Sequence, residues 1–322
     1  MSEEREPMTR VTMFVPGAPP SQAAWNAALE PQGLRIDGGV LEGTGMEHAP
    51  EVMWVPQDGE FGAAFSYGTC SAEVIATLEK APGALVILWK VDLLEGRDHI
   101  VTAVELLRDA GAIAVRLEQS KLGWDVNRWI ELFSSELAND WHRGAVVILS
   151  EDDYVQSCGM HLFSLPDARV PVDGDVAAAN DLVQTLNIYQ IGESPSLQSG
   201  HTFRPDEETP RRVMERWPDI GYPSDHPCHN SYGVWRLGPA GGEARDVGAM
   251  ELTFIPSLAA MLMASEDKKG APLTEQETIA IRDAAAVIAM KPQDARRMER
   301  ARGYADLNPE LVWEQWQLLR DA

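Results

Sequence analysis

The segment Asp225-His226-Pro227-Cys228-His229 places oxygen, nitrogen and sulfur ligands within five residues, and these residue types could together bind a metal ion. A structural zinc site usually takes two close ligands from each of two elements, and the sequence contains no second matching pair of Cys or His residues. We therefore interpret the segment as a polar loop, and we expect neither a metal nor a cofactor.

Cys70 lies where a helix N-terminus could lower the pKa of a thiol, since it follows Gly68-Thr69 and precedes a helix predicted over residues 71–80. A cysteine hydrolase would also need a histidine base, and the sequence does not select one among several. We expect an ordinary half-buried cysteine and keep a cysteine-dependent hydrolase as an alternative. The histidines available as a base are His48, His99, His161 and His201.

Two motifs typical of enzymes are missing from the sequence. Gly38-Gly39 and Gly241-Gly242 lack the spacing of a phosphate-binding loop, and no serine lies in a Gly-x-Ser-x-Gly elbow. We therefore assign no catalytic residue and expect a protein that is not an enzyme.

The net charge of −23 is the strongest signal in the composition. It is concentrated in residues 1–265, where 39 acidic and 18 basic residues give a net charge of −21. A field of this sign repels nucleic acid and anionic membranes and attracts basic proteins. The sequence thus predicts an acidic surface for a basic protein partner; the alternative is that the acidic residues only aid solubility.

Candidate contacts for such a partner are charged or aromatic residues in predicted loops and polar stretches. Three adjacent carboxylates at residues 151–153 could also bind a cation, but neighbouring side chains in an extended segment point alternately apart, so we expect a solvated turn. The candidate contacts are Asp58, Glu60, Glu151, Asp152, Asp153 and Trp217.

The sequence also bears on the cellular location. Residues 1–10 are charged and lack the apolar stretch of a signal peptide, and no run of about 18 apolar residues occurs. Cys70, Cys158 and Cys228 are an odd number of well-separated cysteines, which favours reduced thiols over a disulfide framework. We expect a cytoplasmic protein that does not cross a membrane.

Strands and helices mix along the first half of the chain. The apolar run at residues 84–91 is typical of a central strand covered on both faces, and Asp58-Gly59 predicts a hairpin or short loop between two apolar runs at residues 52–55 and 61–65. Further strands are predicted at residues 11–15, 34–36 and 113–117, and helices at residues 22–29, 71–80, 98–109 and 124–133.

The second half repeats this mixture and ends in helices. Alternation in a strand over residues 158–165 would place Cys158, Met160 and Leu162 on one apolar face, and a Gly-rich loop at residues 238–242 would join two further strands as a hairpin. The remaining predicted elements are strands at residues 145–149, 232–237 and 250–255, a helix at residues 176–189, a helix with a capping box at Thr274 and Glu277 that runs to Ile288, and a last helix that begins at Asn308-Pro309 and carries Val312, Trp316 and Leu319 on one face.

These elements predict an α+β fold of mixed antiparallel sheets with packed helices. We expect a body over residues 8–258, divided into two units at about residues 8–140 and 141–258, each of them a candidate for a ferredoxin-like arrangement. A helical C-terminal appendage over residues 273–322 completes the expected architecture.

A short series of motifs runs through the middle of the chain. A Gly-Met pair is followed by a Phe-x-x-Pro-Asp turn, a predicted helix and a Gly-x-Thr segment, at Gly159, Met160, Phe163, Pro166, Asp167, Gly200 and Thr202. In this order the motifs resemble the bacterial family called domain of unknown function 4261, over residues 84–237. The resemblance implies an α+β bacterial domain of a kind expected near secretion or polymorphic-toxin loci, and it implies no catalytic residues.

The negative charge, the missing catalytic motifs and the resemblance together favour a binding role. We expect an immunity protein that binds and neutralises a basic toxin or effector. The alternatives are an adaptor or chaperone that loads an effector onto a secretion system, and the cysteine-dependent hydrolase.

Overall fold

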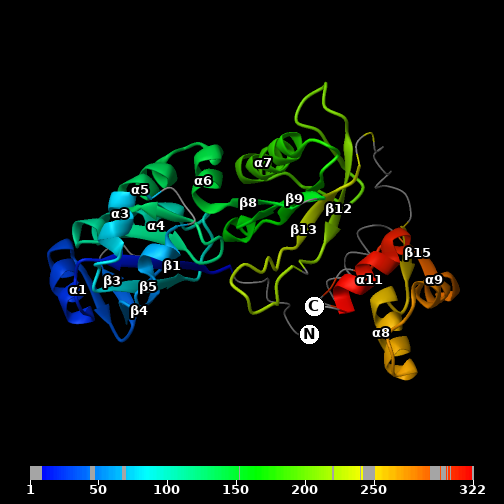
Figure 1. Ribbon diagram of the computed structural model, residues 1–322, viewed down its shortest axis with the longest axis horizontal. Coiled ribbons are helices and arrows are strands. Elements are labelled where there is room, and N and C mark those ends of the chain that lie inside the picture. Colours follow the sequence, from blue (N-terminus) through cyan, green and yellow to red (C-terminus); the bar gives the residue numbers. More distant parts are fainter. Residues whose placement is uncertain are drawn as a thin grey trace. The chain divides into compact units, whose positions relative to one another are not determined.

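Two compact units make up the chain in the computed structural model, which describes residues 9–43, 48–66, 70–151, 153–219, 221–239, 241, 251–290, 298, 302, 304 and 306–320. Unit 1 consists of residues 1–196 and 225–235, and unit 2 consists of residues 197–224 and 236–322 (Figure 1). These limits differ from those expected at residues 140 and 258. The reason is that Met160, Leu162 and Ile191 belong to the same hydrophobic core as the first strands.

The main sheet of unit 1 has seven strands in the order β2-β3-β4-β5-β1-β6-β7, and every neighbouring pair is antiparallel. The predicted central strand is confirmed, since β5 lies between β4 and β1. The strands are β1 (Val11–Gly17), β2 (Leu34–Asp37), β3 (Val40–Gly43), β4 (Glu51–Pro56), β5 (Gly83–Trp89), β6 (Ala114–Leu117) and β7 (Gly123–Asp125).

Four of these strands form a ferredoxin-like arrangement. In the order β4-β5-β1-β6, strands β1 and β4 flank β5 and run parallel to each other, and β5 and β6 flank β1 in the same way. Helix α1 (Gln22–Leu29) follows β1, and helix α4 (Arg97–Asp109) connects β5 to β6. This is the split β-α-β connection made twice. The hairpin β2-β3 extends the sheet at one edge, and β7 extends it at the other.

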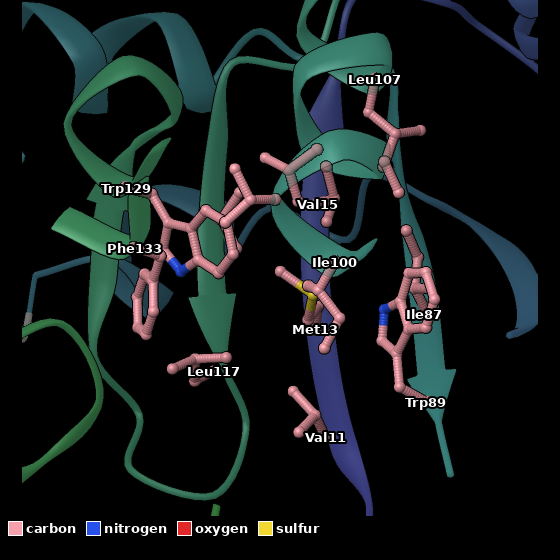
Figure 2. Packing of buried hydrophobic residues seen from close by; sticks show 14 of the residues in the cluster. Val11, Met13, Val15, Ile87, Trp89, Ile100, Leu107, Leu117, Trp129 and Phe133 are labelled. Carbon is pink, nitrogen blue, oxygen red and sulfur yellow. The ribbon is translucent and has the colours of Figure 1, made fainter. Parts of the chain in front are cut away.

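Helices cover both faces of this sheet because the side chains of each strand alternate. Val11, Met13 and Val15 of β1 point into a core that α1, α4 and α5 (Val126–Ser134) close. Figure 2 shows this side, where the Trp129 and Phe133 rings of α5 stack with their centroids 4.4 Å apart. Phe14 lies between these residues in the sequence and packs against a smaller cluster on the opposite face.

The smaller cluster contains a helix at residues 61–64, where one expectation was a strand. Residues Phe61–Ala64 form α2, and residues Ala72–Leu78 form α3. Phe61 and Phe65 lie one helical turn apart and both are buried, so the helical turn packs both rings against one face of the sheet. The expected hairpin at Asp58-Gly59 is therefore a turn that leads from β4 into α2.

The later part of unit 1 is a meander of β8 (Val147–Ser150), β9 (Tyr154–Cys158) and β10 (Asp167–Pro171). Helices α6 (Ala138–Ala145) and α7 (Val176–Glu193) pack on each other, and α7 also covers β9 and β10 (Figure 1). Because three consecutive strands pair as neighbours, this part lacks the split connection of a second ferredoxin-like unit.

The strand expected over residues 158–165 ends at Cys158. Gly159 has a φ of +125°, and an added Cβ there would lie 2.4 Å from the carbonyl oxygen of Ala145, so only glycine fits this bend. Residues Met160–Phe163 then form a 3₁₀ turn, η2. Met160 and Leu162 are buried as expected, although they do not continue a strand.

A buried carboxyl group fixes the bend between β9 and β10. The Oδ1 atom of Asp167 accepts hydrogen bonds from the Ser157 hydroxyl at 2.9 Å and from the Met160 backbone N–H at 3.3 Å. Its Oδ2 atom accepts a hydrogen bond from the Asn230 amide at 2.6 Å, and Asn230 also donates to the carbonyl oxygen of Leu165. The Asp167 carboxyl group therefore ties the segment of residues 225–235 to the meander.

Unit 2 contains two small strand groups and a helical cluster. The hairpin β11-β12 lies next to Arg236 and Leu237 of β13, and β14 pairs with β15. Unit 2 contains the last two residues of β13 (Val234–Leu237), whose first two residues belong to unit 1. Its other elements are β11 (Thr202–Phe203), β12 (Arg212–Trp217), β14 (Glu251–Phe254), α8 (Leu258–Lys269), α9 (Glu275–Ala284), β15 (Val287–Met290), η3 (Pro309–Leu311) and α11 (Val312–Arg320).

Several expectations fall on unit 2. The capping box of Thr274 and Glu277 is confirmed, but α9 ends at Ala284, and Ile288 lies in β15. The predicted last helix is confirmed by α11, whose Val312 and Trp316 are buried in the core of the unit. The expected hairpin through residues 238–242 is not formed with β14, because β14 pairs with β15; most of the connecting residues lie outside the described part of the chain.

The architecture as a whole confirms the predicted α+β class, with antiparallel sheets, packed helices and a helix near the C-terminus. None of the helices described here has the length and apolar character needed to span a membrane.

We predict that Asp167→Ala lowers the free energy of unfolding by about 3 kcal/mol, because three buried donors lose their acceptor. Urea denaturation followed by tryptophan fluorescence measures the change. Asp153→Ala, in an exposed turn of the same meander, is the control and should change the value by less than about 0.5 kcal/mol. Equal effects of the two substitutions would contradict the role given to Asp167.

The helix pair α6-α7 contains a buried histidine. The His142 Nε2 and Asn187 Nδ2 atoms are 3.3 Å apart, and both side chains are buried. Burial disfavours the imidazolium ion and lowers the pKa of His142 from 6.5 to about 4.

The lowered pKa of His142 predicts a loss of stability in mild acid. Above pH 6.5 the ring is neutral in both states. As the pH falls toward about 4, the unfolded chain takes up the proton before the folded protein does, so up to about 3 kcal/mol is lost across this window. The stability difference between the wild type and His142→Gln, measured by urea denaturation at pH 7 and pH 4, should shrink by this amount. A pH-independent difference would show that the histidine is not held neutral.

Candidate functional site

A depression in the surface of unit 1 collects charged and aromatic side chains from β1, β6, α2 and the loop before α2. Its volume is about 440 Å³. The Phe14 and Phe61 rings meet edge to face with their centroids 4.9 Å apart, which provides an apolar wall. The residues around the depression are Phe14, Asp58, Glu60, Phe61, Ala63, Ala64, Arg116 and Lys121.

The loop that carries the two acidic residues is held in one conformation. The Gln57 amide donates to the carbonyl oxygen of Leu78 at 3.0 Å, and its Oε1 atom accepts from the backbone N–H groups of Asp58 and Gly59. The Asp58 carboxylate accepts from the Glu60 N–H at 2.9 Å. Gly59 adopts a φ of +94°, which the turn requires. Asp58 and Glu60 are therefore presented by an ordered turn.

The two basic residues of the depression share one carboxylate within the protein. Arg116 and Lys121 bind the two carboxylate oxygens of Glu118 at 2.6 Å and 2.8 Å. The Arg116 guanidinium also donates to the carbonyl oxygen of Ala64 and lies 5.4 Å from the Phe14 ring centroid. Neither Asp58 nor Glu60 forms an ion pair with any residue that the structure describes. With Glu118, three carboxylates face two cations, which leaves a net charge of −1 at this site and Asp58 and Glu60 as its exposed carboxylates without an ion pair to the residues described.

The other predicted contact residues lie elsewhere. Glu151 and Asp153 are exposed in the β8-β9 turn, which contributes no residue to the depression, and Asp152 lies outside the described residues. Trp217 belongs to β12 of unit 2, where it is half-buried and the Arg236 guanidinium lies 4.2 Å from its ring centroid. Trp217 is therefore not the openly exposed anchor that the polar sequence around it suggested.

The environment of Cys70 does not favour a nucleophile. Ser71 is the N-cap of α3, so the thiol lies before the helix. Burial raises the pKa of Cys70 to about 11, and the carboxylate of Asp125 acts in the same direction. At neutral pH the group is a thiol, so its surroundings do not supply the thiolate that a Cys70 hydrolase would need.

The structure brings together two other cysteines that are 70 residues apart in the sequence. The Cys158 thiol at the end of β9 is 3.8 Å from the carbonyl oxygen of Cys228 and 3.6 Å from that of Gln119. Cys228 lies in the segment that was considered as a metal ligand set. No group of three or more potential ligands converges within the part of the chain that the structure covers.

Two of the predicted partner contacts, Asp58 and Glu60, lie at the depression, and the sequence did not point to its other residues. Phe14 and Arg116 appeared only as members of strands, and the period of a strand does not say which strand will be its neighbour. A comparison with models of known protein families, curated protein sequences and solved structures gives no match. The resemblance of residues 84–237 to domain of unknown function 4261 stays a prediction.

We predict that Cys70 is a slow thiol. In the native protein at pH 7 its alkylation by iodoacetamide, followed by mass spectrometry, should be at least about tenfold slower than that of a cysteine in an unfolded peptide, because so little of it is thiolate. The rate should rise toward pH 10. Alkylation of Cys70 at the rate of the unfolded peptide would restore the hydrolase alternative.

Proposed function

We propose that this is a non-catalytic, cytoplasmic binding protein that neutralises a basic bacterial toxin or effector. Unit 1 would block the partner sterically. The negative electrostatic field of unit 1 would accelerate and orient its association with that partner. The observation that carries the proposal is the division of charge between the two units. Unit 1 contains 31 acidic and 12 basic residues, a net charge of −19, whereas unit 2 contains 19 and 15, a net charge of −4.

Solubility alone does not call for so uneven a division, since any surface of the chain would serve that purpose. The exposed carboxylates of unit 1 include residues that form no ion pair with the residues described, among them Asp58, Glu60, Glu151 and Asp153. A cationic side chain from a partner would gain two charge-assisted contacts at the Asp58-Glu60 turn. The half-buried Phe14 ring in this depression would cover the aliphatic part of a lysine or arginine.

The ordered turn makes this depression the best candidate for a specific contact. The Asp58 carboxylate, which the Glu60 N–H holds in place, loses little conformational entropy when a partner binds. The neighbouring pair of Arg116 and Glu118 is buried by about four-fifths, which gives the site a fixed edge. A basic residue that enters would meet a rigid acidic rim and an apolar wall.

The test uses the product of the adjacent gene as the candidate partner. Co-purification should yield a stable complex, and co-expression should rescue the growth that the neighbour alone inhibits. A complex without rescue would favour an adaptor for a secretion system, and the absence of both complex and rescue would refute the proposal.

We predict that removing the charges of the depression weakens this complex. Asp58→Asn combined with Glu60→Gln should raise the dissociation constant at least about tenfold, chiefly by slower association at low salt. Glu151→Gln combined with Asp153→Asn removes the same charge from the β8-β9 turn and is the matched control, with an expected change of less than about threefold. Equal losses for both pairs, measured by biolayer interferometry, would assign binding to net charge and not to the depression.

A further inference from the structure

The two buried cysteines of unit 1 form a chemical group that the proposed binding function does not use. Cys158 and Cys228 are 3% and 7% exposed, so both thiols lie beneath the surface and Cys228 is the more accessible. Cys158 donates toward the carbonyl oxygens of Gln119 and Cys228, which orients its sulfur toward the segment that carries Cys228. Small oxidants can reach such a site, whereas bulky thiol reagents are hindered.

Three structural elements hold the pair in place. Cys158 ends β9, immediately before the bend at Gly159 that only glycine can make. Cys228 is held by its own backbone N–H, which donates to the His226 Nδ1 atom at 3.1 Å. The carbonyl oxygen of Pro227 lies 3.1 Å from the His161 Nε2 atom of η2. The segment around Cys228 is thus docked on the same turn that follows Cys158.

We propose that Cys158 and Cys228 form an oxidisable dithiol site, which a hydroperoxide converts into an intramolecular disulfide. In the first step the Cys228 thiolate attacks the terminal oxygen of the peroxide. The O–O bond breaks, the sulfur becomes a sulfenic acid, and the other oxygen leaves as water or an alcohol after it takes up a proton. In the second step the Cys158 sulfur attacks the Cys228 sulfur, the S–O bond breaks, and water leaves with the Cys158 proton.

The electrostatic surroundings agree with this division of roles. A hydrogen bond from the Cys158 side chain is the largest influence that lowers the pKa of Cys228 to about 6, and His226 and Lys121 contribute in the same direction. Cys70 has the opposite environment, with a pKa raised to about 11. Of these two cysteines, Cys228 is therefore the one with thiolate available at neutral pH.

The test is peroxide treatment of the folded, full-length protein, followed by denaturation, alkylation and mass spectrometry under non-reducing conditions. Two of the three thiols should be lost, and the tryptic peptides of residues 144–169 and 217–236 should appear as one cross-linked species. Cys70 should remain alkylated. Three alkylated cysteines, oxidation confined to Cys70, or sulfinic acid at Cys228 without the cross-link would each overturn the proposal.

Variants separate the two steps. Cys158→Ser removes the resolving thiol, so Cys228 should stop at the sulfenic acid and be labelled by dimedone, with complete loss of the cross-link. Cys70→Ser is the matched control and should form the cross-link to the same extent as the wild type. Since the wild-type experiment needs no substitution, it decides the proposal even if Cys158→Ser fails to fold, and its result is independent of whether a toxin partner binds.

Discussion

The later part of unit 1 depends on the hydrogen bonds that the Asp167 carboxyl group accepts. A buried carboxyl group is tolerated only when donors surround it, and its donors come from β9, from η2 and from the segment of residues 225–235. One side chain therefore joins β9 and η2, which precede it closely in the sequence, to a residue 63 positions later. Because Asn230 and Cys228 belong to the same short segment, the thiol pair depends on this hydrogen-bond network.

The candidate binding surface arises from an equally simple constraint. Alternation along β1 sends Val11, Met13 and Val15 into the main core and leaves Phe14 on the opposite face. Helix α2 covers part of that face and ends before it covers the whole, so the Phe14 and Phe61 rings border a depression. The apolar wall thus results from the alternation of side chains along β1. The turn before α2 adds negatively charged side chains beside this wall.

Local patterns predicted local structure well. The continuous apolar run of β5, the capping box of α9 and the helix of residues 22–29 were all found from spacing and residue type. The errors fall where tertiary packing decides between two local options, as at Phe61 and Phe65, where apolar residues four apart fit either a helix or a short strand. The proximity of Cys158 and Cys228 could not be predicted, because the sequence around each cysteine does not indicate that the other lies close to it.

The discontinuous chain of unit 1 has a consequence for its biosynthesis. The Thr9 hydroxyl, next to β1, is 2.6 Å from the hydroxyl of Tyr232, and the two residues are 223 positions apart. During translation the first strands can pair early, but the network that includes Asn230 and Tyr232 must wait until these two residues have left the ribosome. Until then Asp167 lacks one of its donors, and the nascent chain carries an unfinished unit that chaperones can recognise.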